Sequence, residues 1–442
     1  MSGWKEFTLN EIADFPPVVK LYRGYEYSFI KMEDISVGQR FVLPEEKRRY
    51  GNSSCSKFGN DDILFARITP CLENGKIAQV KLRKNNSGFG STEFFVFRGK
   101  KEKLNQSFLY YLAKSDLIWK SAVNSMVGAS GRQRADSGFL GNLRFRIPLL
   151  PIQRKIAAVL SAYDDLIENN NRRIAILEKM AAELYREWFV RLRFPGHDSV
   201  GAGLKPAPTK GVPEGWTVKT VEQSFEYLGG GTPSTLVNSY WQGGDINWYS
   251  PTDLTAANAV FSFQSKAQIT ELGLKESSAR LFPPYSIMMT SRATIGQISI
   301  NTTPACTNQG FITCIPNDKV PLYFLYYWLK LNKEYFIQIA NGATFLELTK
   351  GKFKNVNILI PPVRIIEPYT KGQRPIFEIL EILLRQKEYL ITSRDRLLSR
   401  LMSGKIDVEH LDIALPKSMM NEADAELVEA PPGMKEEAVA NA

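Results

Sequence analysis

The chain has 442 residues, of which 44% are hydrophobic and 23% are charged, with a formal net charge of +10. This composition excludes a disordered or fibrous protein. No apolar run approaches the roughly 18 residues of a membrane helix, which excludes a membrane-spanning chain. The amino terminus has no charged run followed by an apolar block, so we expect a cytoplasmic protein with no membrane partner.

The positive charge lies outside the carboxy-terminal end of the chain. Residues 418–442 contain six acidic residues and one lysine, a charge of −5, so residues 1–417 carry +15. A basic body of this size favours a polyanionic partner.

The counts of histidine and cysteine limit the possible chemistry. Histidine occurs only at positions 197 and 410, so a mechanism based on a buried histidine is not expected. The four cysteines form no CxxC pair. We therefore expect reduced thiols in the core and no metal site.

The sequence contains an internal duplication. Gly3-Trp4 recurs as Gly215-Trp216, and the FLYY block at 108–111 recurs at 324–327. The segments 142–148 (NLRFRIP) and 355–361 (NVNILIP) match at an offset of 213. A period this long indicates two similar domains rather than a solenoid. We call residues 1–148 repeat 1 and residues 215–361 repeat 2.

Each repeat has a mixed α/β pattern. Residues 63–65 and 94–97 of repeat 1, and 298–300 and 311–315 of repeat 2, are rich in β-branched and aromatic residues and predict strands. Residues 107–124 and 322–339 predict one helix each. Tyr110 and Tyr111 fit the core of such a helix better than a stacking site for nucleic acid.

A long helix is predicted over residues 149–194, after repeat 1. Its apolar positions alternate in steps of four and three, which is typical of a coiled coil. About 40 helical residues would span roughly 60 Å. Asn170 either lies buried in the seam and sets its register, or is exposed. The seam consists of Ile156, Leu160, Tyr163, Ile167, Asn170, Ile174, Leu177, Ala181, Leu184 and Trp188.

A second long helix is predicted within residues 362–404, after repeat 2. Pro375 and Gly404 suit its first turn and its end. Leu383, Leu390 and Leu397 form its stripe, which Lys387 and Arg394 interrupt. The two helices can pair antiparallel and hold the repeats apart, or bind a partner helix, or both.

The remaining segments have coil composition. Residues 195–214, rich in proline and glycine, predict a linker. Residues 405–442 predict a tail that is disordered from about residue 418. The fold class expected is therefore α+β, with two similar mixed α/β domains separated by two long helices that form an antiparallel coiled coil.

Motifs for catalysis are missing. The sequence has no GxxxxGK[ST], so no P-loop for ATP. The segment 282–285 (FPPY) lacks the polar first residue with which adenine methyltransferases hold a flipped base. No SAM-binding glycine motif or nuclease pattern accompanies it. We expect no catalytic and no metal-binding residues in this chain.

Four segments resemble the specificity subunit of type I restriction-modification systems. Residues 230–254 (GGTPSTLVNSYWQGGDINWYSPTDL) resemble the opening of a target recognition domain of that family. The segments 147–156 (IPLLPIQRKI) and 166–189 (LIENNNRRIAILEKMAAELYREWF) resemble its central spacer. The segment 397–406 (LLSRLMSGKI) resembles the end of its second spacer. The resemblance covers nearly the whole chain except the tail.

The resemblance implies a DNA-binding subunit without catalytic activity. Two target recognition domains would each read one half of a split site in double-stranded DNA, with the helices setting their spacing. The helices would also dock two modification subunits, and restriction subunits would join them. The resemblance further implies that SAM, ATP and Mg²⁺ belong to these partners, with no cofactor in this chain.

Two departures from the family pattern stand out. The entry to the first spacer is Pro151-Ile152-Gln153, whereas the second has the longer segment 363–374 (VRIIEPYTKGQR) in its place. Repeat 1 lacks the TPS…GGDI signature and has only residues 29–36 (FIKMEDIS) there. The start of the second helix is therefore uncertain from sequence.

Residue type and loop position identify candidate contacts to DNA. Arginine suits guanine, and Asn or Gln suits adenine. Because the polar loop residues differ between the repeats, we predict an asymmetric bipartite target. Each candidate could instead be an ordinary solvated side chain. The candidate base readers are Arg67, Gln133 and Arg134 in repeat 1 and Arg292, Asn308 and Gln309 in repeat 2; the candidate phosphate clamps are Lys76, Arg132, Lys350 and Lys352.

Two alternative functions remain open from the sequence. The chain could be a self-sufficient DNA methyltransferase or nuclease, which would modify or cut DNA alone. It could also be a coiled-coil scaffold that never contacts DNA, which salt-dependent DNA binding would exclude.

Overall fold

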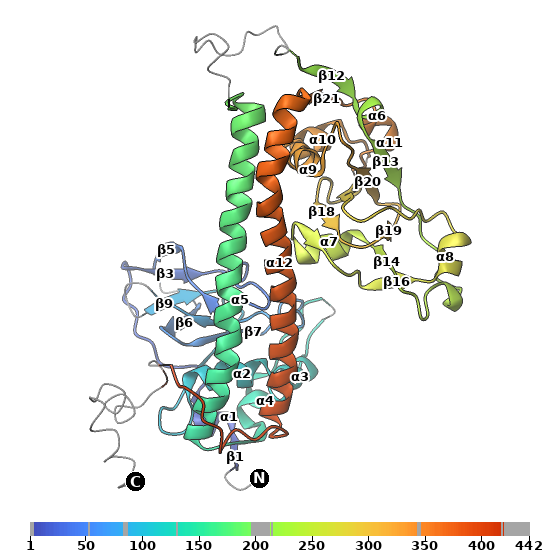
Figure 1. Cartoon of the computed structure of the whole chain (residues 1–442). Coiled ribbons are helices and arrows are strands. Elements are labelled where there is room, and N and C mark those ends of the chain that lie inside the picture. The colour runs from blue at the N-terminus through green and yellow to red at the C-terminus, as the bar shows by residue number, and fades with distance from the viewer. Residues whose placement is uncertain are drawn as a thin grey trace. The chain divides into compact units, whose positions relative to one another are not determined.

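The computed structural model describes residues 4–51, 54–82, 87–129, 131–195, 213, 215–342, 346–416 and 419. Its contacts divide the chain into two units (Figure 1). Unit 1 consists of Met1–Asn169 with Lys387–Ala442, and unit 2 of Asn170–Gln386. The tail beyond residue 419 and nearly all of the predicted linker lie outside the described residues.

Unit 1 contains repeat 1, which is built on three sheets. Strand β1 (Lys5–Thr8) pairs antiparallel with β11 (Arg144–Ile147). The five-stranded sheet has the order β2-β10-β7-β8-β4, formed by Ala13–Asp14, Phe94–Gly99, Ile63–Ala66, Ile77–Val80 and Phe41–Val42. The four-stranded sheet has the order β5-β3-β9-β6, formed by Glu46–Arg49, Glu26–Ile30, Ser87–Gly90 and Ser56–Gly59. Its short helices are α1 (Leu9–Ile12), α2 (Gln106–Lys114), α3 (Trp119–Asn124) and α4 (Ser137–Asn142).

Unit 2 contains repeat 2, with a similar arrangement of strands in which the small sheet has three strands instead of four. Strand β12 (Thr217–Thr220) pairs antiparallel with β21 (Asn357–Ile360). The five-stranded sheet has the order β13-β20-β17-β18-β15, formed by Glu226–Gly229, Phe311–Ile315, Ile287–Thr290, Ile298–Asn301 and Phe261–Ser262. The three-stranded sheet has the order β16-β14-β19, formed by Ala267–Ile269, Ile246–Tyr249 and Ala305–Thr307. Its helices are α6 (Val221–Ser224), α7 (Pro251–Ala257), α8 (Glu271–Lys275), α9 (Leu322–Leu331), α10 (Lys333–Ile339) and α11 (Lys350–Phe353), with a 3₁₀ turn at Asn238–Tyr240.

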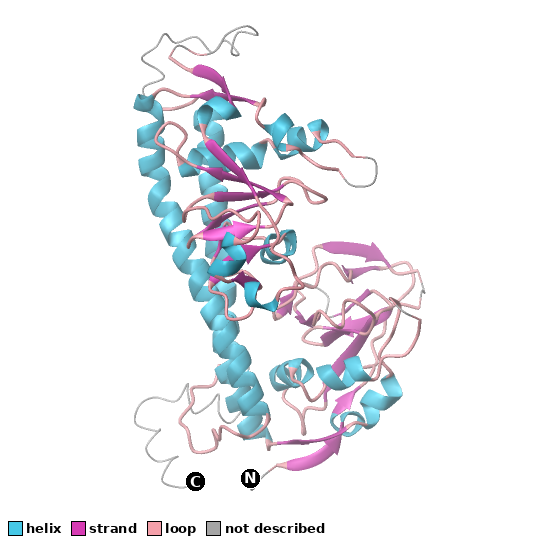
Figure 2. Ribbon diagram, turned by 90° about the vertical axis from the view of Figure 1, so that its right-hand side faces the viewer, coloured by secondary structure: helices cyan, strands magenta, loops and turns pink. Residues whose placement is uncertain are grey.

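The two repeats therefore share one fold, as the duplicated sequence predicts. In both small sheets a central strand pairs parallel on one side and antiparallel on the other. In both large sheets an antiparallel hairpin lies at the centre, β7–β8 or β17–β18. Within each unit the strands lie to one side of the long helices (Figure 2).

Each predicted FLYY helix is two helices instead of one. Helix α2 ends at Ser115, whose hydroxyl donates to the Leu112 carbonyl at 2.6 Å, and α3 follows. Helix α9 ends at Asn332, whose side-chain amide donates to the Trp328 carbonyl at 2.8 Å. These local bonds compete with continuation of the helix. The tyrosines at 110, 111, 326 and 327 are all buried, as predicted for core residues.

The long helices are α5 (Leu150–Tyr185), which continues as a π turn (Arg186–Val190), and α12 (Val363–Met402). The prediction that the second helix begins at Pro375 was wrong, because both Pro368 and Pro375 lie inside α12. A proline within a helix costs about 3 kcal/mol. Ile366, Tyr369 and Phe377 are each at most 2% exposed in the core of unit 2, and this burial outweighs that cost.

The two long helices pair antiparallel in each unit. In unit 2, the Asn170 amide donates to the Gln386 side chain at 3.1 Å, and the Gln373 amide donates to the Ala181 carbonyl at 2.9 Å. Asn170 is 5% exposed, so it lies buried in the seam rather than in solvent. Of the other predicted seam positions, Ile156, Leu160, Ile167, Ile174, Ala181 and Leu383 are buried, and Tyr163, Leu177, Leu184, Trp188, Leu390 and Leu397 are half-buried.

A buried ion pair joins the helices in unit 1. The Arg394 guanidinium, 1% exposed, donates to Asp164 at 2.5 Å and to the Gly38 carbonyl at 3.3 Å. Tyr111 of α2 donates its hydroxyl to the same Asp164 carboxylate. Burial acts to lower the pKa of Arg394, but Asp164 and the neighbouring Asp395 raise it above its usual value. Arg394 is therefore charged, and it links both helices to repeat 1.

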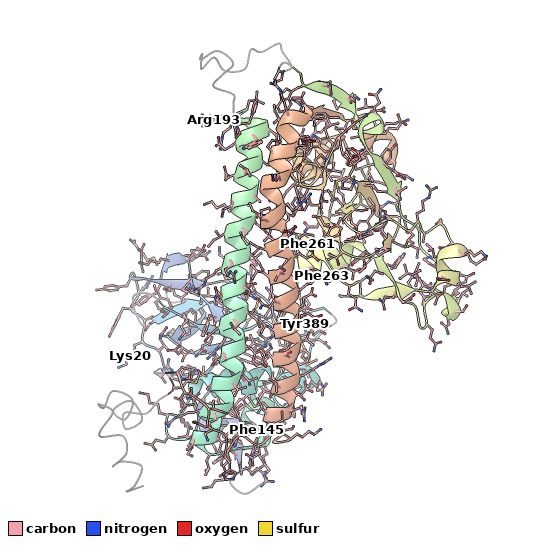
Figure 3. The ribbon with its side chains drawn as sticks, in the orientation of Figure 1. Lys20, Phe145, Arg193, Phe261, Phe263 and Tyr389 are labelled. Atoms are coloured by element: carbon pink, nitrogen blue, oxygen red, sulfur yellow. The ribbon has the colours of Figure 1, made fainter. Side chains whose placement is uncertain are left out.

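The offset of 213 identifies the counterparts of this ion pair in unit 2. At this offset Asp164 corresponds to Phe377, and Arg394 corresponds to Ala181. Tyr111 of the FLYY block corresponds to Tyr327, whose ring centroid lies 6.1 Å from that of Phe377. The same contact is thus ionic in unit 1 and apolar in unit 2. Phe261 also packs on Phe377 beside α12 (Figure 3).

We predict that Asp164→Ala lowers the free energy of unfolding by about 3–5 kcal/mol, because it leaves Arg394 buried without its partner. Asp165→Ala, at the exposed neighbouring position, should have little effect. The double variant Asp164→Phe with Arg394→Ala, which copies unit 2, should recover most of the loss. Urea unfolding followed by circular dichroism measures all three, and equal losses for Asp164→Ala and Asp165→Ala would contradict the prediction.

Candidate nucleic-acid interface

Three loops of repeat 1 meet at one end of the β7–β10 pair. The Arg67 amide donates to the Glu93 carbonyl at 3.0 Å, and the Ala135 amide donates to the Arg67 carbonyl at 2.8 Å. Thr69 and Gln133 are linked by hydrogen bonds in both directions. The structure therefore brings Arg67 beside Gln133 and Arg134, which lie 66 and 67 residues further along the sequence.

Glu93 organises the charges of this cluster. Arg134 donates two hydrogen bonds to the Glu93 carboxylate, with Nη2 2.6 Å from Oε1 and Nε 3.0 Å from Oε2. Arg67 lies 3.9 Å from the same carboxylate, and its guanidinium lies 4.8 Å from the ring centroid of Phe95. The hydrogen bond from Arg134 holds the pKa of Glu93 below its usual value. The carboxylate fixes both arginines at the surface.

The other repeat 1 candidates differ in availability. Arg132 is exposed, and its guanidinium makes no hydrogen bond or ion pair with a described residue. The Lys76 ammonium donates to the Met32 carbonyl at 2.7 Å and is only half-exposed. Arg132 is thus free to bind a phosphate, whereas Lys76 already holds a loop of its own domain.

The matching loops of repeat 2 meet in the same way. The Ser291 amide donates to the Gly310 carbonyl at 2.7 Å, and the Leu348 amide donates to the Ser291 carbonyl at 2.9 Å. Arg292 pairs with Glu347 at 2.8 Å and lies at the surface. Gln309 accepts a hydrogen bond from the Thr232 hydroxyl at 2.6 Å.

The remaining repeat 2 candidates differ in how many hydrogen bonds they make within repeat 2. The Asn308 side-chain oxygen accepts from the Gly310 amide at 2.8 Å, so its amide group remains available. Lys352 donates to the Ile339 carbonyl and the Asn341 side chain, at 2.5 and 2.6 Å. Lys350 is exposed and passes close to Gly229, where a Cβ atom would lie 2.7 Å from its Nζ. Lys352 is therefore structural, and Lys350 remains available.

The shared hydrogen bonds show which loop positions correspond. Arg67 corresponds to Ser291, Glu93 to Gly310 and Arg134 to Glu347. Arg292 occupies the position of Ile68 in repeat 1. Compared with Arg67, the arginine of repeat 2 is therefore one residue later in its loop, and its side chain points to the other side of the chain. The loop with a cation in repeat 1, at 134, carries an anion in repeat 2, at 347. One frame therefore presents two different charge patterns.

Sequence reasoning missed the two carboxylates that hold the arginines, Glu93 and Glu347. Glu93 lies 26 residues from Arg67 and 41 from Arg134, and no periodicity joins them. The one signal available was the FLYY and NLRFRIP alignment, which places position 134 opposite position 347.

Within the described part of the chain, no helix is long and apolar enough to cross a membrane, and no group of three His, Cys, Asp or Glu residues could hold a metal ion. Among the described residues the four cysteines form no disulfide; Cys306 and Cys314 are buried, and Cys55 and Cys71 are half-buried.

Residues 1–179 and 213–396 match the family described as the type I restriction modification DNA specificity domain. The match covers most of the chain, which belongs to this family. The protein is a DNA-specificity subunit, the recognition component of a type I restriction-modification system and not its catalytic part. The resemblance seen in the sequence is confirmed.

Named relatives support this assignment. The chain is 26% identical over 473 residues to the HindI specificity subunit of Haemophilus influenzae, covering 92% of this chain and 100% of the relative. It is 42% identical over 152 residues to the MjaIX specificity subunit of Methanocaldococcus jannaschii, covering 34% of this chain and 35% of the relative. These findings do not support a self-sufficient enzyme or a scaffold that never contacts DNA.

One solved structure shows the same fold. It is the specificity subunit of a type I restriction-modification system from M. genitalium, with a TM-score of 0.52 at 16% identity. The match covers 90% of this chain and 96% of that chain. The α+β architecture with paired long helices is thus confirmed.

We predict that Arg134→Gln raises the pKa of Glu93 toward the usual value, because the hydrogen bond from Arg134 is the largest cause of its depression. Arg132→Gln, two residues away, should leave it unchanged. Carbon-13 NMR titration of labelled glutamate side chains measures both. If the Glu93 titration were the same in the two variants, the ion pair would not form in solution.

Proposed function

We propose that this subunit reads an asymmetric bipartite site in double-stranded DNA. Residues 1–148 and 215–361 are the two target recognition domains, and each reads one half. The observation that carries the proposal is the exchange of charge between Arg134 and Glu347 at equivalent positions of one fold. An arginine offers hydrogen-bond donors and a glutamate offers acceptors, so the two repeats favour different base edges at this position.

We propose specific roles for the loop side chains. Arg67, Gln133 and Arg134 read bases in one half-site, and Arg292, Asn308 and Gln309 read bases in the other. Arg132 and Lys350 bind phosphates, because both are exposed cations. Lys76 and Lys352 were also candidate clamps, but each already binds a main-chain carbonyl, so we assign them to loop support.

We also propose the partners of the complex. Two modification subunits dock on the long helices, and restriction subunits join this assembly. SAM, ATP and Mg²⁺ are bound by those subunits, and the complex works in the cytoplasm.

Exposed apolar side chains on the long helices support two docking sites. Leu166 and Ile379 are 52% and 40% exposed and lie 213 residues apart. Ile176 and Tyr389 are 59% and 74% exposed, at the same offset. Unit 1 therefore presents Leu166 on α5 and Tyr389 on α12. Unit 2 presents Ile176 on α5 and Ile379 on α12. Exposed apolar side chains at repeated positions favour two equivalent partners over one.

Genome-wide mapping of N6-methyladenine, with and without this gene, tests the proposed function. We expect deletion to remove methylation at one split motif whose two halves differ. A palindromic motif would contradict the asymmetric reading. Unchanged methylation, in a cell that makes the modification subunits, would contradict the function.

Single substitutions on the helices test the docking sites. We predict that Leu166→Ser and Ile379→Ser each reduce the number of bound modification subunits from two to one, and that the double variant binds none. Leu411→Ser removes an exposed leucine outside the helices and is the control. Light scattering of the purified complexes gives the stoichiometry. Loss of both subunits from either single variant would argue against two independent sites.

A further inference from the structure

An exposed surface of repeat 1 combines cations with tyrosine rings and consists of residues outside the loops described above. We call it the β5 surface. The loop between β2 and β3 supplies two tyrosines, Tyr22 and Tyr25, each 65% exposed. Figure 3 shows Lys20, from the same loop, projecting away from α5. The whole surface consists of Lys20, Tyr22, Arg23, Tyr25, Lys47, Arg48 and Arg49.

The loop is fixed against the edge strand β5 by main-chain hydrogen bonds. The Gly24 amide donates to the Tyr50 carbonyl at 2.9 Å, and the Tyr50 amide donates to the Tyr25 carbonyl at 2.8 Å. The Tyr27 hydroxyl accepts from the Tyr22 amide at 3.0 Å. Because these bonds hold the loop in place, its exposed rings are presented in a defined position.

The cations of the β5 surface are largely unpaired. Lys20, Arg23, Lys47 and Arg49 make no ion pair with a described residue. The exposed carboxylates Glu26 and Glu45 offset part of this charge. Arg48 is engaged, since it pairs with Glu46 and covers the Phe29 ring at 3.8 Å.

Repeat 2 has the same sheet without this surface. Residues 230–245, which correspond to the loop, contain no lysine or arginine, and strand β16 reads Ala-Gln-Ile where β5 reads Glu-Lys-Arg-Arg. Trp241 of that loop packs on Trp248 at 5.1 Å. Lysine on an edge strand can simply block aggregation. That explanation does not account for the exposed tyrosines beside β5, nor for strand β16, which has Lys266 directly before it but no cation within it.

The β5 surface connects to the candidate reading loops. Lys57 lies over the Tyr50 ring at 5.3 Å, and Tyr50 holds the loop of the tyrosines. A cavity of about 500 Å³ is lined by both Lys57 and Arg67. Lys57 therefore lies between the buried Tyr50, which anchors the β5 surface, and the cavity beside Arg67.

We infer that the β5 surface binds the DNA phosphodiester backbone beside the half-site read by repeat 1, and that repeat 2 has no equivalent contact. The inference rests on the proposed function. Its chemistry is that of phosphate binding by free Lys and Arg side chains, with tyrosine hydroxyls as further donors. The contact of the complex with DNA is consequently longer on one side of the bipartite site than on the other.

The test is the salt dependence of DNA binding by the complex with its modification subunits. The probe is a duplex carrying the methylated motif. Each phosphate contact adds about 0.9 to the slope of log affinity against log salt concentration. We expect Lys47→Ser with Arg49→Ser, and separately Lys20→Ser with Arg23→Ser, to lower the slope by about 2 each. The methylated motif should not change, because these residues read no bases.

The control is Lys5→Ser with Lys101→Ser, which removes two exposed cations of unit 1 outside the four-stranded sheet. It should leave the slope unchanged. Equal slopes for all the variants and the parent would overturn the inference. So would loss of a modification subunit from the β5 variants, since the surface would then be a protein interface. If the parent complex showed no salt-dependent binding, the proposed function itself would fail.

Discussion

The pairing of α5 with α12 is the contact on which both recognition surfaces depend. In unit 1 it includes the buried Arg394–Asp164 pair, and in unit 2 it includes Phe377 packed on Tyr327. In both, the FLYY helix of the repeat supplies a tyrosine to the contact. The orientation of each reading loop relative to its helices therefore rests on a few buried side chains. Because this contact is an ion pair in unit 1 and an aromatic pair in unit 2, the two units are chemically distinct here, although their sequences are duplicated.

The frame is common to the repeats, and the recognition chemistry is not. Main-chain hydrogen bonds hold the same three loops together in both, because backbone geometry follows the strand order. The side chains at positions 134 and 347 are free to differ, since both are accessible to solvent, at 44% and 37% exposed. That freedom explains how a duplicated fold can present an arginine at 134 and a glutamate at the equivalent 347. It also explains why one edge strand is basic and the other neutral.

The sequence predicted the architecture well, because periodic patterns report burial. The heptad spacing identified α5, and the FLYY tyrosines are buried as predicted, whereas the sequence left the burial of Asn170 open. The start of α12 was missed, since local proline preferences were outweighed by packing against repeat 2. The partners of Arg394 and Arg134 were also missed. Asp164 lies 230 residues from Arg394, and Glu93 lies 41 residues from Arg134. Contacts between residues so far apart in the sequence leave no local pattern.

The central claim is that the two repeats read separate halves of one site. Its most direct test compares the methylated motif in cells that express the complex with either Gln133→Ala or Gln309→Ala. Loss of a side chain that contacts a base edge relaxes only the position it contacts. The account predicts that Gln133→Ala relaxes a position in one half and Gln309→Ala a position in the other. Relaxation of the same half by both substitutions would contradict it.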